Sequence, residues 1–394
     1  MRRKASTSTV KCKMDYSLFI SLVRDLYKKP EEFIPLHAPI FNGKEKEYLL
    51  DTIDSTFVSS VGAYVDAFEE KMQELTKTQK AVAVVNGTAA LQVALRLAGV
   101  KAGEEVLTQA LTFVATANSI AYNQAHPVFL DVDRDTMGLS PDALTAFLES
   151  HAEKREGGAY NKTTQKRIAA CLPMHTFGLM ARIQEIVDIC TQWNIPVVED
   201  AAEALGSSTN GKAAGSFGLL GTFSFNGNKI VTCGGGGAIV SNDVELGQRG
   251  KYLTTTAKVP HSWEYVHDEL GYNFRMPNVN AALACAQLEQ LDTFIVQKGK
   301  LFDQYSLFFE DSEIKIKQPL ADTSSNHWLI ALELPDREAR DTFLRITNDA
   351  GVMTRPIWQL MYRLPMYQDC QRDDQINAKF LEDRIVNIPS SVRS

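Results

Sequence analysis

Short apolar strands alternate with helical patterns along most of the chain, and this alternation constrains the fold more than any other feature. Runs rich in Val, Ile, Leu and Ala have the length and composition of buried strands at 81–85, 105–109, 127–132, 168–174, 196–200, 221–225 and 237–240. Between and before them, apolar residues recur at helical spacing over 45–56, 64–76, 89–98, 114–123, 141–149 and 181–193. Such alternation predicts an α/β domain built on a mainly parallel seven-stranded sheet.

The pattern changes after about residue 256. Helical runs around 278–310 precede a strand near 328–334 and a helix near 336–350, which predicts a smaller C-terminal α+β domain. Near the start, apolar residues between 18 and 26 mark one face of a helix that packs on the body or on a partner subunit. We therefore expect an N-terminal helical arm over 1–33, a large α/β domain over 34–255 and a small α+β domain over 256–394.

A carboxylate and a lysine follow two of the predicted strands. Asp200 ends the strand 196–200, and Lys229 lies twenty-nine positions later, beyond the strand 221–225. In enzymes that use pyridoxal phosphate (PLP), a carboxylate keeps the pyridine nitrogen protonated and a lysine bonds covalently to the cofactor. Taken singly, Lys229 also fits a surface lysine in a glycine-flanked turn, and Asp200 also fits a helix N-cap. Their order along the chain favours the PLP site.

A candidate phosphate site lies upstream of this pair, where the strand 81–85 turns into a helix through Asn86, Gly87 and Thr88. The free amides of a first helical turn and the helix dipole attract anions, Gly87 lets the backbone approach, and Thr88 adds a hydroxyl. Many α/β folds have a similar Gly-Thr turn, so this motif alone is a weak signal. Its position before Asp200 and Lys229 suits the order of a PLP site.

Charge and cysteine usage exclude several classes of protein. A net charge of -7 and a pI near 5.6 argue against a nucleic-acid binder. The six cysteines are scattered without C-x-x-C spacing, so no metal site is expected and a reducing cytoplasm is the simplest location. The basic start at 1–4 is followed by a segment too polar for a signal peptide, and no stretch is apolar enough to cross a membrane.

Five motifs, in order and spread over the chain from about Ile34 to the C-terminus, resemble the DegT/DnrJ/StrS sugar-nucleotide aminotransferases. They are Asn86 to Leu91, Thr112 to Asn118, Glu199 to Glu203, Ser224 to Lys229 and Gly271 to Met276. Within that family, 57–65 and Asn326-His327-Trp328 are most similar to the branch that aminates UDP-4-keto-6-deoxy-N-acetylglucosamine on routes to legionaminic acid or bacillosamine.

The resemblance implies a fold type I aminotransferase that is a homodimer, with both subunits building each active site. Lys229 would be the covalent lysine and Asp200 the partner of the pyridine nitrogen, while Phe113 would stack on the ring and Asn273 would reach the cofactor of the neighbouring subunit. Alone, Phe113 also fits a core aromatic residue and Asn273 a turn. The full cofactor-binding set would be Gly87, Thr88, Ala89, Phe113, Asp200, Glu203, Ser224, Lys229 and Asn273.

Candidate substrate residues are Ser60 and His327 from the branch motifs, together with His175, Arg275 and Arg355. A guanidinium suits the carboxylate of an amino donor or the phosphates of a nucleotide, although most arginines are solvated surface groups. His175 follows a strand and also fits a histidine satisfied by backbone contacts. Glu203 would contact a sugar hydroxyl or the cofactor's O3′, or it is a first-turn helix carboxylate.

The predicted reaction transfers an amino group from an amino acid, glutamate by resemblance, to the 4-keto carbon of a nucleotide-linked 6-deoxy sugar. The expected substrate is UDP-2-acetamido-2,6-dideoxy-4-hexulose, for surface polysaccharide or nonulosonic acid biosynthesis. Related sugar 3-dehydrases replace the lysine with histidine, so Lys229 argues for transamination. Two alternatives stay open: a GDP- or dTDP-linked 4-keto or 3-keto sugar, and a non-catalytic PLP-binding regulator with the same fold.

Overall fold

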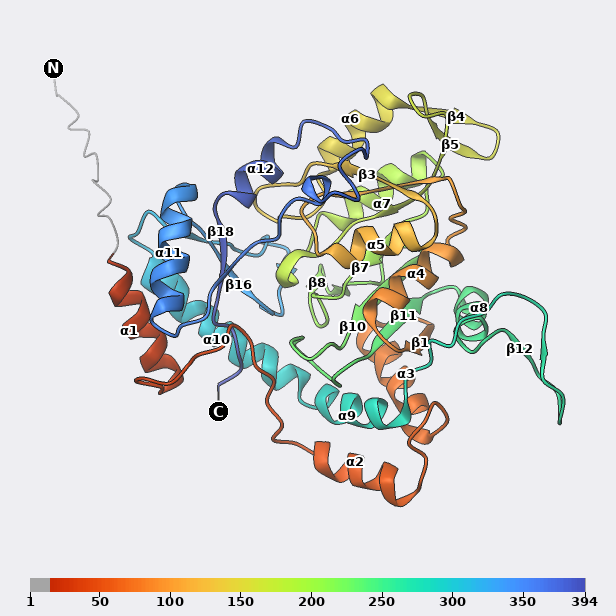
Figure 1. Cartoon of the computed structure of the whole chain (residues 1–394), viewed down its shortest axis with the longest axis horizontal. Helices are drawn as coiled ribbons and strands as arrows, with labels where there is room; N and C mark the ends of the chain where they lie inside the picture. The colour runs from red at the N-terminus through yellow and green to blue at the C-terminus, as the bar shows by residue number, and fades with distance from the viewer. Residues whose placement is uncertain (1–14, 394) are drawn as a thin grey trace.

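A computed structural model of the protein describes residues 15–393 (Figure 1). Residues 1–14 lie outside this range. They contain the basic start, which was interpreted as no signal peptide, and the first part of the predicted N-terminal arm. All seven predicted strands of the large sheet are present: β1 (Lys80–Val84), β2 (Glu105–Gln109), β3 (His126–Leu130), β6 (Arg167–Leu172), β7 (Val198–Asp200), β10 (Leu220–Ser224) and β11 (Gly237–Ser241).

These strands form one sheet in the order β1–β11–β10–β7–β6–β2–β3. Parallel bridges from Cys171 to Val197 and from Met174 to Asp200 connect β6 with β7. The pairs β3–β2, β2–β6 and β7–β10 are parallel, whereas β11 runs antiparallel to both of its neighbours. A hairpin of β4 (Ala152–Arg155) and β5 (Gly158–Asn161) extends the edge of β6. The predicted α/β class with a mainly parallel sheet is confirmed.

Helices cover both faces of the sheet, because alternate strand residues point to opposite sides. Val82 and Val84 join a core with α4 and α5, whereas Ala81 and Ala83 join a second core on the other face. The helices of this part are α2 (Glu45–Asp54), α3 (Ala63–Thr76), α4 (Gly87–Leu97), α5 (Val114–Tyr122), α6 (Pro141–His151), α7 (Ile183–Gln192) and α8 (Val244–Thr254). Of these, α8 was not predicted from the sequence.

A second sheet, in the order β14–β16–β18–β17, forms the C-terminal part. Its strands are β14 (Lys315–Ile316), β16 (Ile330–Glu333), β17 (Arg355–Pro356) and β18 (Ile385–Ile388), and its helices are α10 (Leu291–Phe309), α11 (Arg337–Asp349) and α12 (Ile376–Glu382). The predicted N-terminal helix, α1 (Tyr16–Tyr27), packs here: the Phe19 ring lies 5.2 Å from that of Phe343 and 6.1 Å from that of Tyr305. α9 (Asn278–Leu288) packs on α2 and α3. The predicted domain boundaries stay predictions.

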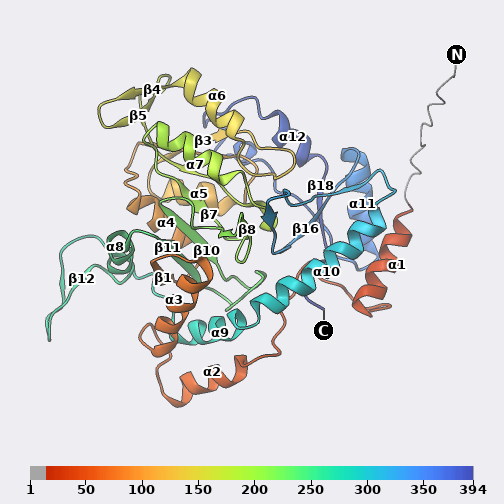
Figure 2. The same cartoon turned by 180° about the vertical axis from the view of Figure 1, so that it is seen from behind.

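The remaining strands form two small sheets. A three-stranded sheet joins β8 (Ser208–Thr209), β9 (Lys212–Ala213) and β15 (Thr323–Ser324), and therefore connects the two parts. The hairpin of β12 (Lys258–Val259) and β13 (Val266–His267) projects from the body at the end opposite α1 (Figures 1 and 2). Within residues 15–393, no helix has the length and apolar character needed to cross a bilayer.

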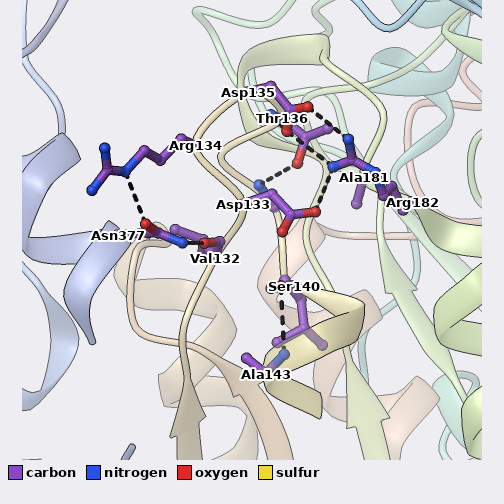
Figure 3. Close-up of polar contacts among 12 residues, drawn as sticks. Val132, Asp133, Arg134, Asp135, Thr136, Ser140, Ala143, Ala181, Arg182 and Asn377 are labelled. Atoms are coloured by element: carbon purple, nitrogen blue, oxygen red, sulfur yellow. Dashed lines mark hydrogen bonds and ion pairs between the residues drawn. The ribbon is translucent and has the colours of Figure 1, made fainter. Parts of the chain in front are cut away.

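The loop after β3 joins α12 and α7 to the large sheet (Figure 3). Asn377, at the start of α12, donates from Nδ2 to the Val132 carbonyl and accepts from Nε of Arg134. On the other side of the loop, Arg182 forms ion pairs with Asp133 and Asp135 at 2.5 and 2.6 Å. The C-terminal part is thereby anchored beside the carboxyl ends of the parallel strands.

Candidate active site

A cavity of about 440 Å³ lies where the carboxyl ends of the parallel strands face the C-terminal part. Ligands of open α/β sheets bind at this edge. Asp200 ends β7, Ser224 ends β10, and Lys229 follows in the next loop. The cavity is lined by eight of the predicted site residues: Gly87, Thr88, Phe113, Asp200, Glu203, Ser224, Lys229 and Arg355. The structure therefore assembles residues that lie up to 268 positions apart, from Gly87 to Arg355.

Lys229 lies between an aromatic ring and a carboxylate. Its Nζ is 3.9 Å from the ring centroid of Trp328 and 3.4 Å from Oε1 of Glu203. The indole of Trp328 is itself fixed, because Nε1 donates to the Asn228 carbonyl at 2.7 Å. The amine therefore has a defined position inside the cavity, with 13% of its side chain exposed.

Asp200 is a buried carboxylate with several stabilising partners. Its Oδ2 accepts from the Thr116 hydroxyl at 2.8 Å, and its Oδ1 accepts from the Ala202 amide at 3.2 Å. Burial raises the pKa of Asp200, and the two donors and the nearby Lys229 oppose that effect. A buried carboxylate of this kind is stabilised further by a cation, which a protonated pyridine nitrogen supplies.

Glu203 faces Lys229 from one side of the cavity. Its Oε2 accepts from the Phe177 amide at 2.9 Å, which leaves Oε1 toward the lysine. Burial raises the pKa of Glu203 to about 7, and the charge of Lys229 opposes the rise. Phe177 has a left-handed backbone, with φ at 56°, which a phenylalanine rarely adopts. The site therefore holds Glu203 at some conformational cost.

The N-terminus of α4 also lines the cavity, through Gly87 and Thr88. A Cβ added to Gly87 would lie 2.7 Å from Cβ of Ser224, so the backbone approach at this point requires glycine. The hydroxyls of Thr88 and Ser224 also line the cavity. Asn86 caps the helix, because its Oδ1 accepts from the Ala89 amide at 2.8 Å. That amide is thus already bonded, and Ala89 is absent from the residues that line the cavity.

The donor set fits PLP. An anion-binding helix end with two hydroxyls suits the phosphate, the Asp200 carboxylate suits the ring nitrogen, and the Lys229 amine lies in the same cavity. Phe113, at the N-cap of α5, also lines the cavity and is 49% exposed. An aromatic face of this kind is available to stack on a planar ring.

Six of the predicted residues lie away from the lining of this cavity: Ser60, Ala89, His175, Asn273, Arg275 and His327. His175 is fully buried; its Nδ1 accepts from the Ala181 amide, so Nε2 carries the proton and donates to Glu199 at 3.0 Å. His175 therefore lies in the core with both ring nitrogens hydrogen-bonded, as in the alternative interpretation of this residue, and not against the substrate. Glu199 also accepts from three amides of the loop at 215–218, which makes this pair part of the support behind Asp200.

Of the other assignments, Ser60 lies in the loop after α2, Asn273 and Arg275 contact each other, and His327 packs within the C-terminal part. Arg275 donates to Oδ1 of Asn273 at 3.1 and 3.2 Å, and Asn273 is exposed. His327 stacks on Phe302, with centroids 4.3 Å apart, and burial lowers its pKa to about 4. This histidine is therefore neutral and packed on α10, whereas its neighbour Trp328 reaches the cavity.

Five cavity residues of the C-terminal part were outside the predicted site: Trp328, Leu329, Pro356, Trp358 and Asn387. Trp358 packs against Phe177, with centroids 4.8 Å apart. Asn387 is 3% exposed and lies opposite Arg355 in the β17–β18 pair. The motif that contains Trp328 was recognised for its resemblance, but nothing in its local pattern tells which side chain enters the cavity.

Comparison with known proteins agrees with this geometry. The profile of the DegT/DnrJ/EryC1/StrS aminotransferase family matches residues 39–393. A Bacillus subtilis protein named as a pyridoxal phosphate-dependent aminotransferase, EpsN, is 36% identical over 85% of this chain and 84% of its own. The GDP-perosamine synthase of Escherichia coli O157:H7 is also 36% identical, over 91% of this chain and 93% of its own.

The fold has close counterparts among solved structures. The aminotransferase TlmJ from Streptoalloteichus hindustanus superposes with a TM-score of 0.83 at 24% identity, covering 91% of this chain and 93% of its own. This similarity confirms the predicted aminotransferase fold.

Proposed function

Because the chain belongs to the DegT/DnrJ/EryC1/StrS aminotransferase family, it is a PLP-dependent aminotransferase, and we propose that it aminates a nucleotide-linked keto sugar. The donor is an amino acid, L-glutamate first, and the acceptor is the 4-keto carbon of UDP-2-acetamido-2,6-dideoxy-4-hexulose. One observation carries the proposal: Asp200, Lys229 and the amide-rich end of α4 line a single cavity. The product serves surface polysaccharide or nonulosonic acid biosynthesis.

Each residue has a distinct task in this reaction. When bound, PLP supplies an electron sink and holds the amino group between the two half-reactions. Asp200 keeps a proton on the ring nitrogen through its buried negative charge. The hydroxyls of Thr88 and Ser224 and the start of α4, which line the cavity, would bind the cofactor's phosphate. With the cofactor bound, the Lys229 amine would take the proton from the donor's α-carbon and would later return a proton to the sugar carbon.

Arg355 is the candidate for an anionic group of the substrates. Its Nη1 donates to Oδ1 of Asn348 and to the Thr354 carbonyl, and no carboxylate of residues 15–393 forms an ion pair with it. Its remaining guanidinium donors therefore stay available at the cavity wall. We infer that they bind the donor's carboxylate or a nucleotide phosphate. An Arg355→Lys variant would keep the charge and lose bidentate binding. A rise in the KM for the amino donor would identify the donor's carboxylate as the ligand, and a rise in the KM for the sugar nucleotide would identify a phosphate.

We also propose a homodimer with shared active sites. Exposed apolar residues cluster from the end of α2 into the following loop, at Leu50, Ile53, Phe57, Val58 and Val61. Exposed apolar clusters of this kind mark association surfaces. Ser60 lies in the same loop, and Asn273 and Arg275 lie outside the cavity of their own chain.

Mixing inactive variants tests the shared site. If Asn273 serves the partner's cofactor, subunits carrying Lys229→Ala and subunits carrying Asn273→Ala regain activity when they are unfolded and refolded together. Sedimentation should give twice the mass of the 43.7 kDa chain. A monomer, or mixtures that never regain activity, would contradict the proposal. The described cysteines are free thiols, which supports a cytoplasmic location.

A GDP-linked sugar is the second candidate, because a 36% identical relative is a GDP-perosamine synthase. The experiment that decides is mass-detected amination of UDP-, GDP- and dTDP-linked 4-keto and 3-keto sugars with PLP and glutamate. Amination of the UDP sugar, abolished in Lys229→Ala, is the expected result, and Lys300→Ala on the surface is the matched control. Preference for the GDP sugar would move the assignment to that substrate. No amination, with PLP still bound through Lys229, would favour the regulator.

A further inference from the structure

We propose that Glu203 is the proton partner of Lys229: its carboxylate takes the ammonium proton, so that the lysine is a neutral amine when it acts as a base. This inference rests on the proposed function, in which Lys229 must be unprotonated to accept the donor's proton. It assigns to Glu203 a catalytic task that differs from contact with a sugar hydroxyl or with the cofactor.

The contact between the two groups is direct and enclosed. Nζ of Lys229 lies 3.4 Å from Oε1 of Glu203, and the carboxylate side chain is 2% exposed. Among residues 15–393, Glu203 is the one acidic side chain within ion-pair distance of Lys229. The other nearby carboxylate, Asp200, is occupied by Thr116 and the Ala202 amide. A proton that leaves the lysine therefore has Glu203 as its nearest protein acceptor.

Backbone contacts on two sides fix the orientation of Glu203. The Phe177 amide donates to Oε2, and Nδ2 of Asn326 donates to the Glu203 carbonyl at 2.9 Å. Phe177 reaches this position only with its left-handed backbone, and Gly178 follows with φ at 94°. Two consecutive residues in this region form a loop shaped to present one amide to the carboxylate. The oxygen that faces Lys229 is therefore the free one.

Electrostatics then favours sharing of the proton. Burial raises the pKa of Glu203 to about 7, Asp200 adds to the rise, and Lys229 and the Phe177 amide oppose it. An exposed glutamate, with a pKa of about 4.3, would stay ionised beside an ammonium at neutral pH. In an enclosed site the neutral pair of amine and carboxylic acid is much closer in energy to the ion pair.

The step is a simple proton transfer. The N–H bond of the Lys229 ammonium breaks, an O–H bond forms on Oε1 of Glu203, and the two charges cancel without any change of oxidation state. When the lysine must donate to the sugar carbon in the second half-reaction, it can recover the proton from the same oxygen. Glu203 thus allows one lysine to serve as base and as acid in turn.

The test compares Glu203→Gln with Glu203→Asp. Glutamine keeps the shape and can still accept from the Phe177 amide, but it cannot take a proton; aspartate keeps the carboxyl group. We expect Glu203→Gln to lower kcat about 100-fold, with KM and melting temperature nearly unchanged and the pH profile of kcat altered. Glu203→Asp should recover part of the loss. Glu45→Gln is the control, because Glu45 is a buried carboxylate on α2 that bonds Gln287 and Gln290.

Infrared spectroscopy gives a readout that is independent of activity. A carboxyl band that titrates near pH 7 should be present in the wild-type protein without PLP and absent in Glu203→Gln. An unchanged kcat and pH profile in Glu203→Gln, while the wild type transaminates, would overturn the inference and leave the proposed function intact. A wild type that aminates no sugar, with the carboxyl band still titrating, would instead count against the proposed function and leave the Glu203–Lys229 pair standing.

Discussion

Replacing Lys298 should change how the stability of the protein depends on pH. Lys298 lies on α10 and is fully buried, and its Nζ donates to the carbonyls of Trp328, at 3.2 Å, and of Ser390. No carboxylate among residues 15–393 forms an ion pair with it, and His37 and His327 are the titratable neighbours whose pKa values its charge lowers. Burial without a counter-charge lowers the pKa of Lys298 to about 7.

The size and sign of the effect follow from linkage. In the unfolded chain the lysine titrates at its ordinary value of 10.5, so between pH 7 and 10.5 the unfolded state binds more protons than the folded state. Stability must therefore rise with pH, by about 5 kcal/mol over the whole titration and by about 2 kcal/mol between pH 7 and 9. Below pH 7 both states are mostly protonated and the contribution is constant.

Urea unfolding at pH 7, 8 and 9 measures this contribution. The wild type should gain about 2 kcal/mol over this range relative to Lys298→Met, which removes the titrating group. Lys300→Met is the matched control, because Lys300 lies two residues further along the same helix and is exposed. Its curve should run parallel to that of the wild type. Parallel curves for wild type and Lys298→Met would refute the reasoning, since the lysine would then titrate alike in both states.

Three further variants test the backbone around the cavity. Gly178→Ala should lower stability by about 3 kcal/mol in thermal melts, because φ is 94° and the new Cβ would meet Oδ1 of Asn326 at 2.0 Å. Gly87→Ala should weaken PLP binding in an absorbance titration and lower the melting temperature of the apoprotein, because its Cβ would lie 2.7 Å from Cβ of Ser224 and push the two backbones apart at the cavity. Asn326→Ala should cost about 3 kcal/mol in urea unfolding, since it leaves the buried carbonyls of Glu203 and Leu205 without a donor. Full stability of Gly178→Ala or Asn326→Ala, or unchanged PLP affinity of Gly87→Ala, would contradict the respective argument.

The large sheet was predictable because its strands are short, apolar and separated by periodic helices, which is a local property of the sequence. Helix α8, which the sequence pattern did not predict, shows the limit of that approach. It contains Gly247 and Gly250, which weaken a helical pattern, yet a Cβ on Gly247 would lie 2.5 Å from the Lys80 side chain. The close contact between α8 and the Lys80 side chain of β1 therefore requires glycine at position 247. Strands of two residues, such as β17, are too short to show any period.

The sequence by itself determined the residues that sit at strand ends, since Asp200, Ser224, Gly87 and Lys229 each follow a recognisable apolar run. The carboxyl ends of parallel strands lie at one edge of the sheet. The proximity of these four residues therefore follows from the predicted parallel sheet alone. Only the tertiary structure decided which groups from the C-terminal part face them. Trp328 reaches Lys229 while its neighbour His327 turns away onto Phe302, and His175 points into the core instead of the cavity. These directions depend on packing between segments that are separated in sequence, by 99 positions for Trp328 and Lys229 and by 25 for His327 and Phe302, which no local pattern encodes.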